Sequence, residues 1–171
     1  MKTCFRPADL AAFLSALFLW AGQPVAFAAE SADGRPKPFP KDSPEHQALT
    51  AASPYLGNDA FTLRNDYWTG AVTTDAGTAV RLQFFKGNVY RLFLGASPPK
   101  LPEGARLHLH IFNDQSEEVI SASSPAGQPA VVLNFEKVRK TGQYLVLMRI
   151  EPRPGPAAPV AVPSVLFYGW E

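Results

Sequence analysis

Two histidines lie two residues apart in the alternating stretch from Ala105 to Asp114. In an extended strand, side chains spaced in this way point to the same face, with their bases about 7 Å apart. His108 and His110 are therefore near enough to bind one metal ion, because imidazole is a common metal ligand. The same pattern is typical of the solvated face of a half-buried β-strand, which is the simpler interpretation.

A metal site usually needs a third and a fourth protein ligand. The one other histidine, His46, lies in a proline-rich stretch, and Asp114 and Glu117 lie beyond the strand. Arg106 shares the face of the two histidines and would repel a cation. We therefore predict neither a metal site nor a cofactor, and we keep the histidine pair as candidate ligands of a weak site.

Motifs that carry catalysis are missing from the sequence. There is one cysteine, Cys4, and there is neither a Gly-x-Ser-x-Gly elbow nor a phosphate-binding glycine loop. Paired carboxylates hydrolyse glycosides, but the adjacent Glu117 and Glu118 are more typical of a turn surface. We predict that the protein is not an enzyme.

Aromatic residues offer a different kind of site. Trp68, Tyr168 and Trp170 are suited to stack on sugar rings, which would make the chain a carbohydrate-binding domain. Tyr144, in the sequence TGQY, has two interpretations. A tyrosine at the mouth of a late sandwich strand often tethers its hydroxyl to a nearby loop, and the alternative is a ligand-stacking ring.

Residues 1–28 have the three parts of a secretory signal peptide: an early positive charge from Lys2 and Arg6, a short apolar run and an A-x-A cleavage signal. The run is shorter than the roughly 20 residues of a transmembrane helix. We predict cleavage after Ala28, a periplasmic or secreted protein, and no stable membrane span. Because Cys4 is removed with the signal peptide, the mature chain forms no disulfide.

The chain carries 16 Lys and Arg against 15 Asp and Glu, a net charge of +1. Such a balance argues against electrostatic capture of nucleic acid or of an anionic membrane. An envelope protein or a polysaccharide is the expected kind of partner, and nothing in the composition chooses between them.

A proline-rich leader over residues 29–54 is expected to be flexible. Within it, a short helix from Pro44 to about Ala51 is predicted, because Asp42 or Ser43 is a suitable cap and proline suits the first turn. Residues 55–171 form the folded domain.

Short β-branched and aromatic runs separated by turn residues predict about eight strands in this domain. The clearest pair, residues 78–85 and 89–95, is predicted to form a hairpin across Lys86 to Asn88. The proline-rich stretch 152–163 is predicted not to be a central strand, because proline donates no ladder hydrogen bond. Since crossover helices are missing, we predict an all-β fold, an antiparallel sandwich or jelly roll.

Three segments in the order FFKGNVYRLFLGA, ARLHLHIFNDQSEEVISAS and KTGQYLVLMRI resemble the bacterial pre-peptidase C-terminal domain. The matching positions are Gly87 and Tyr90; Leu107, Leu109, Asn113 and Asp114; and Thr141, Gly142 and Tyr144. The resemblance covers residues 78–150 and implies a jelly-roll-like sandwich. The chain departs from the family in having Arg106, His108 and His110 where acidic residues often stand, and in having no protease domain before it.

One feature does not fit a sandwich with a polar exterior. The second face of the predicted hairpin carries Phe85, Val89 and Phe93, and that of the Tyr144 strand carries Leu145 and Leu147. Such a surface is either covered within the chain or an interface. We predict cover by the leader and the 152–163 loop. The function expected is that of a non-catalytic exported binding or structural module of the cell envelope.

Overall fold

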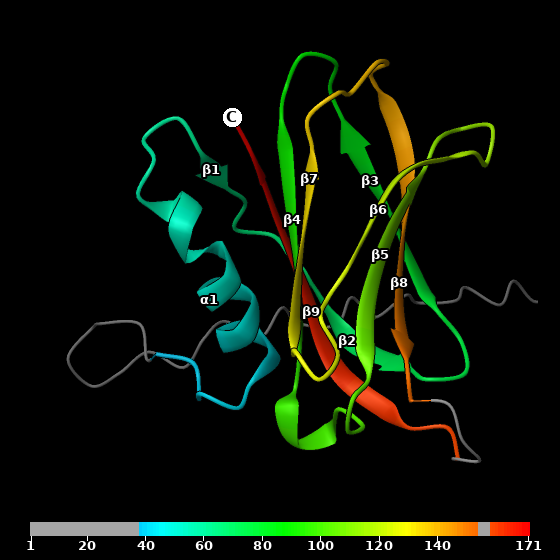
Figure 1. Cartoon of the computed structure of the whole chain (residues 1–171). Helices are drawn as coiled ribbons and strands as arrows, with labels where there is room; N and C mark the ends of the chain where they lie inside the picture. The colour runs from blue at the N-terminus through cyan, green and yellow to red at the C-terminus, as the bar shows by residue number, and fades with distance from the viewer. Residues whose placement is uncertain (1–37, 154–157) are drawn as a thin grey trace, which may run out of the picture. The chain divides into compact units, whose positions relative to one another are not determined.

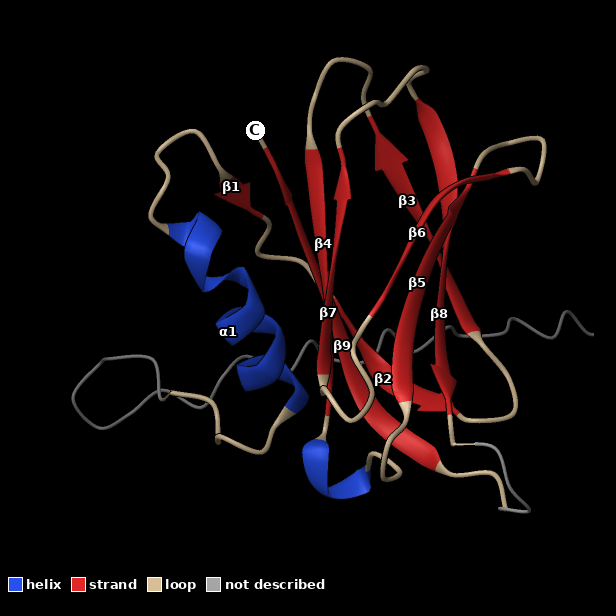
Figure 2. Ribbon diagram, in the orientation of Figure 1, coloured by secondary structure: helices blue, strands red, loops and turns tan. Residues whose placement is uncertain are grey.

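The computed structural model describes residues 38–153 and 158–171. The predicted signal peptide and residues 29–37 of the predicted leader lie outside them. Among the described residues, two antiparallel sheets face each other and a helix lies against one of them (Figures 1 and 2). The predicted all-β sandwich is confirmed. None of the described helices is long and apolar enough to cross a membrane.

The described elements are a helix, a short 3-10 turn and nine strands, compared with about eight strands predicted. Their bounds are α1 (Pro44–Leu56), β1 (Thr62–Leu63), β2 (Trp68–Thr73), β3 (Thr78–Phe84), β4 (Tyr90–Ala96), η1 (Pro98–Lys100), β5 (Arg106–Phe112), β6 (Glu118–Ser123), β7 (Ala130–Phe135), β8 (Gly142–Glu151) and β9 (Ala161–Trp170). One sheet has the order β1-β9-β4-β7, with β2 also paired to β9, and the other has the order β3-β8-β5-β6.

The core between the sheets follows the two-residue period of the strands. Leu107, Leu109 and Ile111 of β5 are fully buried, whereas the residues between them are partly exposed. The rings of Phe84 and Tyr90 meet inside the core with centroids 4.5 Å apart. The faces predicted to point inward are confirmed, because each places its apolar residues in this one cluster.

The predicted hairpin between residues 78–85 and 89–95 is wrong. β3 pairs with β8, while β4 pairs with β7 and β9, so the short turn carries the chain from one sheet to the other. Gly87, with φ of 98°, supports that turn. The error has a physical reason: strands facing each other across a core alternate in the same way as strands paired in a hairpin.

The proline-rich stretch 152–163, predicted not to be a central strand, nevertheless supplies the beginning of one, because β9 begins at Ala161 and lies between β2 and β4. Pro163 is accommodated at the end of the β4 ladder. Its carbonyl accepts a hydrogen bond from Ser97 N at 2.9 Å, one residue beyond β4. Because β4 has already ended at this position, the missing N–H of Pro163 removes no hydrogen bond from the β4 ladder, and proline is tolerated.

Helix α1 begins where the sequence predicts. The Ser43 hydroxyl accepts a hydrogen bond from His46 N at 3.2 Å, and Pro44 occupies the first turn. The helix extends to Leu56, beyond the predicted end near Ala51 and across the predicted boundary at residue 54. The extension follows from packing, because Ala48 and Ala52 are fully buried against the sheet that contains β4 and β9.

The apolar second face of the sequence divides into two separate surfaces. Phe93 of β4 is fully buried beneath α1, in a cluster with Val165 and Phe167 of β9. Leu145 belongs to β8 in the other sheet and is 38% exposed, and Phe85, just after β3, is 52% exposed. The described part of the leader therefore covers the first surface, and the second surface is open to solvent.

Candidate functional site

The outer face of the β3-β8-β5-β6 sheet presents its side chains in rows across the strands. The register places Arg81, Leu145 and Phe112 in one row, Ala79, Leu147 and His110 in the next, and Arg149 beside His108 in a third. The apolar side chains of the face are therefore concentrated around Leu145 and Leu147, with Gln83 and Gln143 toward one end of the strands and Arg149 and His108 toward the other. We call this outer face the open face.

His108 and His110 lie on the open face, with ring centroids 6.1 Å apart and an angle of 18° between the ring planes. His108 Nε2 lies 3.0 Å from Oε2 of Glu151 on β8. His110 Nδ1 lies 3.1 Å from Oε2 of Glu118, the first residue of β6. Each imidazole thus contacts its own carboxylate on a different neighbouring strand.

These contacts do not assemble a metal centre. No group of three or more His, Cys, Asp or Glu side chains suited to a metal ion occurs in the described part of the chain. His46 lies in α1, which packs on the other sheet, and Asp114 is ion-paired with Lys140 at 2.7 Å. The extra ligands considered from sequence are therefore directed elsewhere. Glu118 and Glu151, which do reach the histidines, lie on opposite sides of β5.

The carboxylate of Glu118 is electrostatically favoured in this position. A hydrogen bond from Ser121 and a second contact, with His110, lower the pKa of Glu118 below its ordinary value. His108 differs: its Nε2 is shielded from solvent, and the contact with Glu151 lacks hydrogen-bond geometry. The His110 contact therefore links β5 to β6, whereas His108 lies close to Glu151 of β8 without a hydrogen bond.

A hollow of about 550 Å³ lies on the open face around Leu145 and Leu147. Phe112, Leu145 and Leu147 line it, and Arg81 and Gln143 add a guanidinium and an amide. An apolar surface with a few polar groups is the usual composition of a binding site. The hollow combines residues from three strands and the turn after β5, and sequence spacing alone gave no signal of it.

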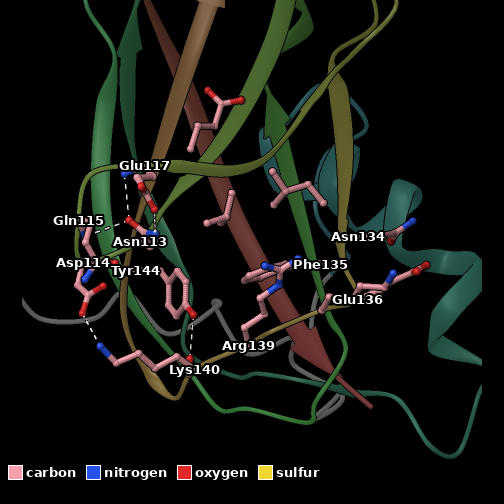
Figure 3. Close-up of a pocket in the computed structure, with 14 residues that line it drawn as sticks. Asn113, Asp114, Gln115, Glu117, Asn134, Phe135, Glu136, Arg139, Lys140 and Tyr144 are labelled. Atoms are coloured by element: carbon pink, nitrogen blue, oxygen red, sulfur yellow. Dashed lines mark hydrogen bonds and ion pairs between the residues drawn. The ribbon is translucent and has the colours of Figure 1, made fainter.

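A second depression, of about 720 Å³, opens at the end of the sandwich between β6 and β7, and we call it the end cleft (Figure 3). Ile120 of β6 and Phe135 of β7 are among its apolar lining residues. Arg139, Asn134 and Glu136 also line it, and in Figure 3 the side chains of Asn134 and Glu136 extend away from that of Arg139.

Most of the remaining polar groups at the cleft are already engaged. Lys140 Nζ lies 2.7 Å from Asp114, and this mutual hydrogen bond lowers the pKa of Asp114 and raises that of Lys140. Asn113 donates to Glu117 at 2.8 Å. The Tyr144 hydroxyl donates to the Lys140 carbonyl at 2.8 Å, so the predicted tether to a loop backbone is confirmed.

The aromatic residues considered for sugar stacking do not form an exposed platform. Tyr168 is buried in the core, and Trp68 and Trp170 are partly buried against the same cluster. The Arg64 guanidinium lies 5.4 Å from the Tyr168 ring centroid and 6.0 Å from that of Trp170. Since sugar stacking requires accessible ring faces, these positions favour a structural role.

A comparison with protein-family models finds none that matches this chain, and a search of curated proteins finds no match either. The class of the protein is therefore set by its architecture, an antiparallel β-sandwich with one sheet covered by a helix.

Proposed function

We propose that the chain is a non-catalytic, exported β-sandwich module that binds an envelope protein or polysaccharide through its open face. The observation that carries this proposal is the exposure of large apolar side chains on the outer face of the β3-β8-β5-β6 sheet, whereas α1 covers apolar side chains on the outer face of the other sheet. Phe85 and Leu145 remain in solvent, although the same chain supplies a helix that buries Phe93 on the other sheet. Exposed apolar residues beside polar groups are typical of interaction sites.

Arg81 adds a charged hydrogen-bond donor to the apolar part of this site. The guanidinium lies on the open face in the same row as Leu145 and Phe112, beside the hollow. Guanidinium and aromatic groups are enriched at interfaces, because both combine an apolar surface with polar recognition. A partner that presents an apolar group next to a carboxylate or a hydroxyl would match this arrangement.

Export to the periplasm or beyond the cell is supported by the signal-peptide pattern of residues 1–28. Membership of a pre-peptidase C-terminal-like group is part of the proposal. It is supported by the tight turn at Gly87, the buried Tyr90 that follows it, and the tethered Tyr144. These residues have structural roles, so they favour a shared fold and say nothing of a shared ligand.

Quantitative binding to purified peptidoglycan and to solubilised envelope proteins tests the proposal. We expect the double variant Leu145→Glu, Leu147→Glu to bind at least about tenfold more weakly than the unmodified protein, because two buried charges oppose docking. Leu56→Glu is the matched control, since Leu56 is also exposed but lies at the end of α1. Full retention of binding by the double variant would exclude the open face.

A further inference from the structure

The sandwich is open along the side where β6 and β7 form the edges of their sheets. β7 pairs with β4, and β6 pairs with β5, and neither has a second partner among the described strands. The two strands are joined by residues 124–129 and diverge from that loop (Figure 1). Residues at their far ends line the end cleft. The cleft therefore lies beside two rows of strand-edge backbone groups.

The outward groups of β7 follow from its ladder. Ala96 N donates to the Pro129 carbonyl at 2.8 Å, and regular pairing with β4 continues through the whole of β7. Because backbone groups of an antiparallel strand alternate between the partner and the other side, those of Ala130, Val132 and Asn134 point away from β4. Among the described residues, no backbone hydrogen bond reaches these groups.

The other sheet edges carry features that discourage pairing. β6 has a register shift opposite Ile111 and Phe112, which distorts its edge next to the cleft. On β2, the Ala71 carbonyl accepts a hydrogen bond from the Thr78 hydroxyl at 3.4 Å. β3 carries the charged Arg81. In contrast, β7 has the sequence AVVLNF, with neither a charge nor a proline to protect its edge.

We propose that the edge of β7 binds an extended peptide of another protein by strand addition. Alternate N–H and C=O groups at strand spacing are matched by another extended backbone, and this match identifies the partner as a peptide. An apolar side chain of the peptide enters the end cleft against Phe135 and Ile120.

The charge of the cleft identifies a further property of the peptide. Arg139 and Lys137 line the cleft and make no ion pair with any described residue, whereas Lys140 is paired with Asp114 (Figure 3). Two further acids of the lining are engaged, because Glu117 accepts a hydrogen bond from Asn113 and Glu118 contacts His110. Glu136 also lines the cleft, and in Figure 3 its side chain extends away from Arg139. An acidic side chain or a terminal carboxylate on the peptide therefore complements Arg139.

A random hexapeptide library, measured against the full chain, is the probe for this site. The matched probe is the same library with alternate amides N-methylated, which blocks strand pairing and retains the side chains. We expect binding of the first library to exceed that of the second at least tenfold, to favour acidic members, and to slow hydrogen exchange at the amides of Val132 and Asn134.

Two pairs of variants separate the contribution of backbone hydrogen bonds to peptide binding from the contribution of charge. Asn134→Pro removes an outward N–H without removing a β4 ladder bond, and should weaken binding at least tenfold, whereas Asn134→Ala should bind within twofold of the unmodified chain. Arg139→Glu should reverse the preference for acidic peptides, and Lys100→Glu, on η1, should leave it unchanged. Because the N-methylated library needs no variant, the proposal stays testable if Asn134→Pro does not fold.

Equal binding of the two libraries, no binding of either, or protection of the β7 amides by soluble peptidoglycan fragments alone would overturn strand addition. This edge is separate from the open face. The variant Leu145→Glu, Leu147→Glu should therefore retain peptide binding, and a negative result at one surface leaves the other proposal standing.

Discussion

The outer faces of the two sheets both carry large apolar side chains, but only one face is covered. On the β4 and β9 side, α1 buries Phe93, Val165 and Phe167. On the open face, Phe85 and Leu145 remain exposed beside polar groups and paired histidines. The comparison shows that apolar residues on an outer face stabilise the fold where the same chain covers them. Where no described segment covers them, they remain available to a partner.

The covered face is built for close approach. A Cβ added to Gly95 would lie 2.2 Å from the Pro44 carbonyl oxygen and 2.7 Å from Ala48 N, so the helix backbone rests directly on the strand. Nothing lies within 4 Å of a Cβ added to Gly142 in the other sheet. We interpret α1 as part of the folded domain and the open face as the surface left for a partner.

The largest difference between the faces should appear when a phenylalanine is truncated. Phe93→Ala should lower the free energy of unfolding by about 4 kcal/mol, because a fully buried ring is replaced by a cavity. Phe85→Ala, at a ring 52% exposed, should lower it by no more than about 0.5 kcal/mol. Urea denaturation measures both, and equal losses would contradict the assignment of cover to one face.

A glycine pair tests the approach of the helix. Gly95→Ala should destabilise by about 2 kcal/mol, because the new methyl group must displace α1. Gly142→Ala should change stability by less than about 0.5 kcal/mol. Thermal denaturation followed with a hydrophobic dye should report earlier dye binding for the first variant, and a silent Gly95→Ala would mean that α1 does not rest there.

The start of the helix makes a smaller contribution. Ser43→Ala removes the acceptor for His46 N and should cost about 1 kcal/mol. Ser53→Ala is the matched control in the same helix, because the Ser53 hydroxyl donates to the Thr50 carbonyl and alanine favours helix. If the two substitutions had the same effect on urea midpoints, α1 would not depend on its cap.

Polar contacts on the open face should have the smallest effect. The folded-state pKa of Glu118 is below its unfolded value, so its contribution is present above about pH 4.5 and is lost as the pH falls. Solvent screening limits this contribution to about 0.5 kcal/mol or less. Glu118→Gln should therefore lower stability slightly at pH 7 and by less at pH 3. A loss of the same size at both pH values would point to packing instead.

From the sequence it was possible to predict which face of a strand each side chain occupies. It was not possible to predict which strands pair with each other. Alternation placed His108 and His110 on an outer face and Tyr144 in the core, because period two is a local property of extended chain. The pairing of β3 with β8 depends on contacts between residues far apart in sequence. For the same reason, Glu118 and Glu151 were not identified as the partners of the histidines.

The sequence predicted that the leader covers an apolar surface. It did not predict which apolar residues are covered or how long the covering helix is. The leader was expected to lie over an apolar surface, but Phe93 and Leu145 were placed on the same surface, although they belong to different sheets. The predicted end of α1 near Ala51 is too early, and Pro54 lies inside the helix. Burial of Ala52 against the sheet explains how packing outweighs the low helix propensity of proline.

Hydroxyl-radical footprinting of the full chain, alone and with an envelope extract, tests the contrast between the faces most directly. In the free protein, the account predicts rapid modification of Phe85 and Leu145 and slow modification of Phe93. Addition of the extract should protect Phe85 and Leu145. Rapid modification of Phe93 in the free protein, or binding that leaves Phe85 and Leu145 unprotected, would contradict the account.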